Sequence, residues 1–244
     1  MTKARASLMA VLIMSSVGAA AGPAKAQLVE VPTQEQPRST WVQPGSGPLD
    51  GLGTFVYVEA PAPGATQGSL LGYEYTIQFG FEDGSDGVLA LGSRNGQKVA
   101  GFGLIPSHLV DTVPFDWQFG KIYYLLTYRI APDQWAAWVY DWSAATWTYI
   151  AQQTAPAGTG RMLPSSTTGV DYDVVAGLTP AADPRTCAFY PQVHAVLFAP
   201  TGWRGADMTQ ASLSGNTVAA GDCPSVTATI AGWQYYGLGT SASG

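Results

Sequence analysis

The segment 121–152, KIYYLLTYRIAPDQWAAWVYDWSAATWTYIAQ, constrains the fold of this chain most strongly. Val, Ile, Tyr, Trp and Thr dominate three stretches, at 122–130, 135–141 and 147–152, and turn-like segments at 131–134 and 142–146 separate them. β-Branched and aromatic residues favour strands, whereas Pro and Asp favour turns. The segment therefore predicts an antiparallel meander at the centre of a β-sandwich.

Alternation sorts the side chains of this meander into two faces, if the first connection has four residues and Ile130 faces Trp135. The face expected in the core carries Tyr124, Leu126, Tyr128, Ile130, Trp135, Ala137, Val139 and Ile150. The opposite face carries Tyr123, Leu125, Thr127, Arg129, Trp138, Tyr140, Trp147 and Tyr149. An arginine without a partner is costly in a dry core, so this second face is predicted to be partly wet. A slip of one residue would exchange the faces of the slipped strand.

Residues 1–26 have the features of a secretory signal peptide. Lys3 and Arg5 give a positive start, the following apolar stretch is too short to span a bilayer, and Ala24-Lys25-Ala26 fits a cleavage site. No later stretch is long and apolar enough for a transmembrane helix. The sequence therefore predicts a secreted, extracellular protein without membrane insertion.

The net charge and the two cysteines limit which binding partners and which redox state the sequence predicts. Because the signal holds three of the 11 basic residues and none of the 17 acidic ones, the mature chain has a formal charge of about −9. This charge argues against nucleic acid as a partner, which would require a basic patch. Cys187 and Cys223 are the two cysteines, and in an oxidising compartment they are expected to form one disulfide. The bond would add about 3–4 kcal/mol in the chain-entropy model.

The mature chain is expected to form one domain between two loose ends. Residues 27–53 are rich in Pro, Gly, Gln and Ser and predict an extended N-terminal arm, which Trp41 pins to the body. Residues 54–236 contain many short strand-like runs divided by turn signals. They predict an all-β domain, an antiparallel β-sandwich or jelly roll. Residues 237–244 are predicted to be a flexible C-terminal tail.

The runs GYEYTIQFGFEDG and YYLLTYRIAPDQWAAWVYDWSAATWTYI resemble strands of the concanavalin A-like jelly rolls. The resemblance lies in the pattern of strands and covers residues 54–236. That superfamily includes lectins, carbohydrate-binding modules, glycoside hydrolases and polysaccharide lyases, so the resemblance implies a concave sheet face as the sugar site. It does not choose among those activities.

Catalytic candidates are few. Glu74 lies on the polar face of the strand predicted at 72–82, but no second carboxylate has the spacing of a retaining jelly-roll glucanase. Gln192-Val193-His194 is similar to the QIH-like motif of jelly-roll alginate lyases, which makes His194 a second candidate. His194 also lies in an apolar run, where a structural histidine is common.

Metal and cofactor signals are weak. Asp83 and Asp86 lie in EDGSDG, where hard oxygen ligands cluster and could hold calcium. The same sequence is typical of a tight turn, which is the favoured interpretation. No zinc-type histidine spacing occurs, and no cofactor is expected.

An aromatic platform is the favoured site, because sugars stack their apolar C–H faces on Trp and Tyr; the alternative is that these rings belong to the core. The predicted ligand-binding residues are Trp138, Tyr140, Trp147, Tyr149, Arg129, Tyr123, Glu74 and Gln78. The favoured function is a secreted carbohydrate-binding or extracellular recognition protein, with an oligo- or polysaccharide as its partner. A polysaccharide-active enzyme and a structural or adhesive envelope protein remain alternatives, and the oligomeric state is open.

Overall fold

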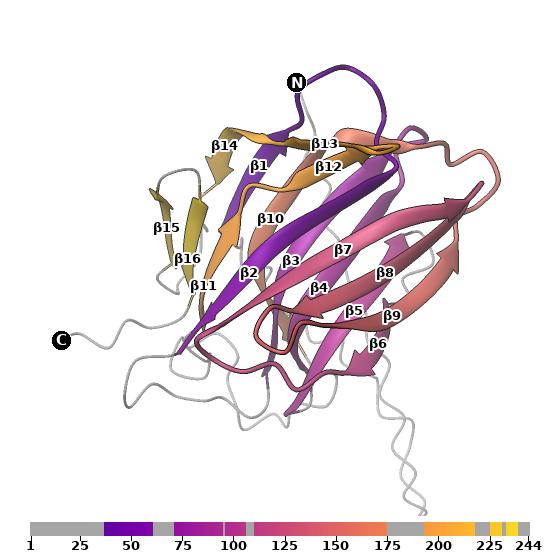
Figure 1. Ribbon diagram of the computed structural model, residues 1–244. Coiled ribbons are helices and arrows are strands. Elements are labelled where there is room, and N and C mark those ends of the chain that lie inside the picture. Colours follow the sequence, from indigo (N-terminus) through magenta and orange to yellow (C-terminus); the bar gives the residue numbers. More distant parts are fainter. Residues whose placement is uncertain are drawn as a thin grey trace, which may run out of the picture.

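The computed structural model describes residues 37–60, 71–94, 96–105, 110–174, 193–217, 225–230 and 233–238. The regular secondary structure elements in these ranges are all strands, and they form two antiparallel sheets packed face to face (Figure 1). The predicted all-β antiparallel sandwich is confirmed. In the same ranges there is no helix of the length and apolarity that crossing a membrane requires. The predicted signal peptide and both cysteines lie outside the described residues, so export and the disulfide stay predictions.

One layer is a seven-stranded sheet in the order β14-β1-β10-β3-β4-β5-β6. Its strands are β1 (Arg38–Val42), β3 (Leu71–Phe81), β4 (Asp86–Arg94), β5 (Gln97–Ile105), β6 (Val110–Pro114), β10 (Met162–Val174) and β14 (Ser212–Thr217).

The other layer is a nine-stranded sheet with the main order β15-β16-β11-β2-β7-β8-β9, while β12 pairs with β2 and with β13. Its strands are β2 (Gly51–Glu59), β7 (Lys121–Ala131), β8 (Gln134–Asp141), β9 (Thr146–Thr154), β11 (Val193–Phe198), β12 (Thr201–Arg204), β13 (Asp207–Gln210), β15 (Ser225–Ile230) and β16 (Trp233–Leu238).

The core lies between the two sheets and follows from the period of two along each strand. In β2 the side chains of Val56 and Val58 are fully buried, whereas their neighbours Phe55 and Tyr57 are half-buried on the outer side. The same alternation buries Val139 in β8 and Ile150 in β9, as predicted. Large rings from both sheets, such as Phe81 and Trp135 at 5.3 Å between centroids, fill the space between them.

Part of the predicted N-terminal arm belongs to the sandwich. Arg38–Val42 forms β1 and pairs with β10 on one side and β14 on the other. Trp41 is buried, and its indole N–H donates a hydrogen bond of 2.8 Å to Thr168 Oγ1. The expectation that Trp41 pins this segment is confirmed, but the segment is a strand rather than a loose arm because both its edges find a partner.

The β7–β8 hairpin corrects the predicted sorting of the faces. Pro132 and Asp133 alone form the turn, with Asp133 in the left-handed region at φ 57°. The pairing shifts by one residue between Arg129 and Ala131, so that Arg129, not Ile130, faces Trp135. Because of this extra residue, the side chains of β7 before the bulge lie on the opposite face from the one that the predicted register gave them. The predicted faces of β8 and β9 are therefore right, and those of β7 are wrong.

Candidate functional site

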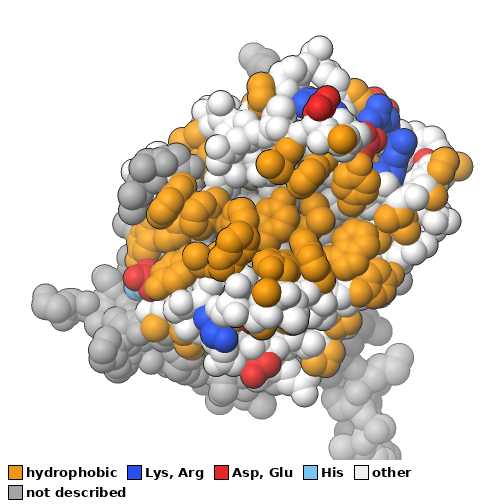
Figure 2. Space-filling view, in the orientation of Figure 1, with side chains coloured by type: hydrophobic (Ala, Val, Ile, Leu, Met, Phe, Trp, Pro, Cys, Tyr) orange, Lys and Arg blue, Asp and Glu red, His pale blue; other side chains and the backbone are white. Residues whose placement is uncertain are grey.

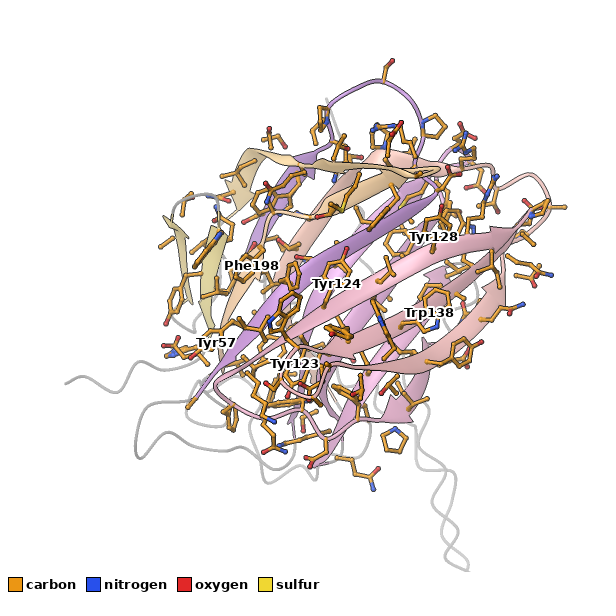
Figure 3. The ribbon with its side chains drawn as sticks, in the orientation of Figure 1. Tyr57, Tyr123, Tyr124, Tyr128, Trp138 and Phe198 are labelled. Carbon is orange, nitrogen blue, oxygen red and sulfur yellow. The ribbon has the colours of Figure 1, made fainter. Side chains whose placement is uncertain are left out.

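Aromatic side chains cover the outer surface of the nine-stranded sheet. They come from six neighbouring strands and from the residue after β8, and we call this surface the aromatic face. Its members are Phe55, Tyr57, Tyr124, Tyr128, Trp138, Tyr140, Trp142, Trp147, Tyr149, Phe198, Trp233 and Tyr235. Figure 2 shows a broad apolar area on this side of the molecule, and Figure 3 labels several of these rings across its width.

The rings contact one another in a continuous row across the strands. Phe198 lies 4.5 Å from Trp233 and 5.8 Å from Phe55, measured between ring centroids. Phe55 lies 4.6 Å from Tyr124, which in turn lies 6.3 Å from Trp147. Tilted and edge-on arrangements at these distances are favourable for aromatic pairs. The row therefore forms one packed surface rather than scattered exposed residues.

Two glycines of β2 make room for tyrosines of β7. A Cβ at Gly51 would meet the ring of Tyr128, and one at Gly53 would meet the ring of Tyr124. The two strands are hydrogen-bonded neighbours, with Gly51 opposite Tyr128. The absence of side chains on β2 at these positions lets both tyrosines lie over the sheet.

Much of the aromatic face is open to solvent. Trp142 is 59% exposed, and Trp147 and Tyr149 are each 52% exposed. This exposed apolar surface is a candidate interaction surface, because monomeric proteins rarely leave large contiguous apolar areas uncovered.

A carboxylate, an imidazole and a phenol meet at one end of the aromatic face. Glu59, the last residue of β2, pairs with His194 of β11, and its Oε2 lies 3.9 Å from His194 Nδ1. Glu59 Oε2 is buried and receives no hydrogen bond from the described residues. The ring of His194 lies 5.8 Å from that of Tyr235 on β16. Burial, and then the charge of Glu59, raise the pKa of Tyr235 above its ordinary value.

Charged residues of opposite sign meet at the other end of β2. Asp50 Oδ1 lies 2.6 Å from Arg161 Nη2 and 3.8 Å from Arg129 Nε, and Asp50 Oδ2 accepts a hydrogen bond of 2.8 Å from Gly205 N. Burial opposes the charged form of Asp50, but the Gly205 hydrogen bond and both arginines outweigh it and lower its pKa. The hydroxyl of Tyr128 donates to Gly205 O, which joins this cluster to the aromatic face.

The structure brings four predicted site residues together and separates the other four. Trp138, Tyr140, Trp147 and Tyr149 share the aromatic face, as predicted, with Trp138 and Tyr149 6.1 Å apart. Tyr123 is fully buried, because the β7 bulge turns it inward, where its hydroxyl accepts a hydrogen bond from Gln118 N.

The remaining predicted residues lie away from the aromatic face. Arg129 lies beside Asp50 rather than among the tryptophans. Glu74 and Gln78 belong to β3 of the seven-stranded sheet, so they lie on the opposite layer of the sandwich. Glu74 and Gln78 therefore cannot contact the same bound ligand as the four aromatic residues.

The predicted turn and metal candidates lie beside the segment that carries Arg161, because Asp83 N donates a hydrogen bond of 3.2 Å to Thr159 O. Asp83 Oδ1 accepts hydrogen bonds from Ser85 N and Ser85 Oγ at 2.9 and 2.6 Å, which is the geometry of an Asx turn. Asp86 begins β4. Within the described ranges no group of three His, Cys, Asp or Glu side chains is arranged to hold a metal ion. Calcium binding therefore stays a prediction.

Sequence reasoning missed two thirds of the aromatic face and Glu59 at its end, but it did single out His194. The alternating run FVYVE already places Phe55, Tyr57 and Glu59 on one side of a strand, so the local pattern could have identified them. The meeting of Glu59 with His194 depends on a pairing between distant strands, for which no local signal exists.

The fold has solved counterparts, although no family model and no curated protein matches this chain. Two of these counterparts are peptidases. One is scytalido-glutamic peptidase with a transition state analog inhibitor, with a TM-score of 0.53, 10% identity, and coverage of 84% of this chain and 98% of that one. Another is SCP-B, an Eqolisin family peptidase in complex with the tripeptide Ala-Ile-His, with a TM-score of 0.48, 9% identity and the same coverage.

These likenesses correct the functional prediction. The solved structure with a TM-score of 0.53 to this chain is a peptidase, and the predicted carbohydrate-binding function is therefore corrected as wrong. The β-sandwich part of the predicted resemblance is confirmed, and its finer placement among concanavalin A-like proteins stays a prediction. At this level of identity the comparison establishes the architecture alone.

Proposed function

We propose that this protein binds polypeptide in extended form along the aromatic face and hydrolyses it beside Glu59. One observation carries the proposal: a carboxylate, an imidazole and a protonated phenol gather at the end of an exposed aromatic surface. The fold supports it, because the solved peptidase with the same architecture was captured with a transition state analog inhibitor.

The dimensions of the aromatic face suit an extended peptide. β2 runs along the face from Gly51 to Glu59, and at about 3.3 Å per residue it spans about 25–30 Å. The rings would bury apolar side chains of the peptide, while tyrosine hydroxyls and tryptophan N–H groups would satisfy its backbone. A peptide lying on the face also explains why so many large rings are exposed there.

Glu59, in this proposal, is the general base for attack by water. Its carboxylate takes one proton from a water molecule, whose oxygen bonds to the peptide carbonyl carbon. The electron pair of the C=O bond moves to the carbonyl oxygen, which becomes an oxyanion. When that pair returns, the C–N bond breaks and the leaving nitrogen takes the proton from Glu59. The products are a carboxylic acid and an amine, and Glu59 regains its charge.

Tyr235 and His194 have separate supporting roles. A tyrosine hydroxyl is protonated at neutral pH, and burial raises the pKa of Tyr235 further, so in this proposal its hydroxyl donates a hydrogen bond to the oxyanion. His194 Nδ1 lies 3.9 Å from Glu59 Oε2, and in this proposal it orients the carboxylate when the peptide is bound, which makes His194 a positioning residue.

The test is digestion of a defined pool of decapeptides, followed by mass spectrometry of the products. The wild-type chain is expected to cleave and Glu59→Gln to lose cleavage by at least about a hundredfold, the usual scale of a general base. Glu74→Gln is the matched control, since Glu74 lies on the opposite sheet, and it should cleave at the wild-type rate. Wild-type protein that leaves every peptide intact, or Glu59→Gln that cleaves normally, would overturn the hydrolytic role.

Export belongs to the same proposal. The features of residues 1–26 support secretion, and in an oxidising compartment Cys187 and Cys223 would pair. Mass spectrometry of secreted protein should find an N-terminus near Gln27 and a Cys187–Cys223 bond. Two free thiols in folded, exported protein would rule out the bond.

A further inference from the structure

We infer that Arg129 and Arg161 bind a carboxylate of the same polypeptide, at the end of the aromatic face opposite Glu59. This inference rests on the proposed function, because it concerns how the proposed peptide is held. It adds a specificity site for acidic groups to a surface that is otherwise apolar.

Two arginines pair with the same carboxylate, that of Asp50. Two guanidinium groups share the single carboxylate of Asp50, one at 2.6 Å and the other at 3.8 Å. A nearby carboxylate, that of Glu82, accepts its hydrogen bond from the backbone N–H of Arg161. Glu82 thus adds a second negative charge beside the cluster, and among the described residues the carboxylate that pairs with both guanidinium groups is that of Asp50.

The hydrogen-bonding capacity of the two arginines is also incompletely used. A guanidinium group has five N–H donors, and it matches the two oxygens of a carboxylate. Among the described residues, Arg161 Nε is buried and has no hydrogen-bond partner. The side chains of Arg129 and Arg161 are 32% and 37% exposed, so an anion can reach each of them from solvent at atoms other than the buried Nε of Arg161.

A short chain of hydrogen bonds connects the arginines with the aromatic face. Gly205 N–H donates to Asp50 Oδ2, and Gly205 O accepts from the hydroxyl of Tyr128 at 3.2 Å. Figure 2 shows basic side chains, with acidic ones among them, at the upper right border of the apolar area, and an acidic group with histidine at its left border. The surface thus has a basic end and an acidic end.

The two ends give a bound peptide one direction. Asp50 directly precedes β2, and Glu59 is the last residue of β2. The distance along the strand between these two residues is about 30 Å, which is the length of roughly nine extended residues. A peptide whose C-terminal carboxylate binds Arg129 and Arg161 would place the bond about eight or nine residues upstream beside Glu59. The structure therefore predicts cleavage at a set distance from a carboxylate.

The experiment measures binding to Glu59→Gln protein, which should not consume the peptide. One decapeptide is used with a free C-terminus, with an amidated C-terminus, and amidated with glutamate as its last residue. Amidation is expected to weaken binding about tenfold, because one charge-assisted pair is lost. The amidated peptide that ends in glutamate shows whether a side-chain carboxylate can replace the terminal one.

Variants assign the effect to the arginines. In Arg129→Met the free and amidated peptides should bind within about twofold of each other, whereas in Lys121→Met, at the other end of β7, the tenfold difference should persist. Equal binding of all three peptides to otherwise unchanged protein would overturn the inference and leave the proposed function intact. Failure of every peptide to bind would overturn both.

Discussion

Glu59 and His194 face each other across β2 and β11, with the carboxylate Oε2 3.9 Å from the imidazole Nδ1. Neither residue is needed to fill the core, because both side chains lie on the outer side of the sheet among partly exposed aromatic rings. An ion pair on a protein surface contributes only about 0–1 kcal/mol to the free energy of unfolding, so the fold does not depend on this pair and its proposed role is catalytic.

Replacing His194 by glutamine should therefore slow cleavage without unfolding the protein. We expect kcat to fall by about 10- to 100-fold with KM and melting temperature nearly unchanged, because a misoriented base affects the reaction more than binding. The measurement is steady-state cleavage of one peptide across the pH range, beside a melting curve. A rise in KM at constant kcat would show that His194 only binds the peptide.

Asp50→Asn should destabilise the protein in a way that depends on pH. Since the folded-state pKa of Asp50 is lowered, its stabilising effect is present above the unfolded value of about 3.9 and is lost as pH falls through the folded value. The difference in free energy of unfolding between wild type and Asp50→Asn should thus be larger at pH 7 than at pH 3. Urea denaturation at both pH values measures it, and an equal difference would contradict the assigned ion pairs.

Val139 and Tyr149 test the two sides of the meander. Val139 is fully buried, so Val139→Asp places an unpaired charge in the core and should abolish folding. Tyr149 is about half exposed on the outer side, and Tyr149→Asp should change the free energy of unfolding by less than about 1 kcal/mol. Circular dichroism and thermal melts measure both. Soluble, cooperatively melting Val139→Asp protein would show that the faces are reversed.

Trp135 and Trp138 separate stability from binding. Trp135 is fully buried against Phe81, so Trp135→Ala should cost about 3–5 kcal/mol. Trp138 lies on the aromatic face, so Trp138→Ala should cost less stability but weaken peptide binding by about 1–3 kcal/mol, the scale of a lost aromatic anchor. Peptide titrations and denaturation curves on both variants provide the comparison. Unchanged peptide binding by Trp138→Ala would remove it from the site.

Most of the fold could be predicted because alternation is a local property. The runs around Tyr75, Val139 and Ile150 each show a period of two, and all three side chains are buried where the pattern places them. The strand at Arg38–Val42 was missed because its short polar run resembles a loop. Only its pairing with β10 and β14 makes it a strand.

The candidate site could be predicted in part, and β7 shows why the rest could not. Both faces of this strand carry large apolar residues, so the hydrophobic pattern does not fix its register. The extra residue at Ile130 then reverses the strand. Arg129 also favoured the wrong assignment of the β7 faces, because an arginine predicts a solvent-exposed face. In the structure Arg129 lies at the end of the strand, beside Asp50.

The indole N–H signals of the eight tryptophans test the central claim most directly, since a proton–nitrogen NMR spectrum observes each one separately. Trp41, Trp117 and Trp135 are buried, whereas Trp138, Trp142, Trp147 and Trp233 belong to the aromatic face. On titration of Glu59→Gln protein with an uncleaved decapeptide, the signals of the second group should shift saturably and those of the first should stay in place. Saturable binding that leaves the aromatic-face signals unmoved would contradict the claim that this face holds the polypeptide.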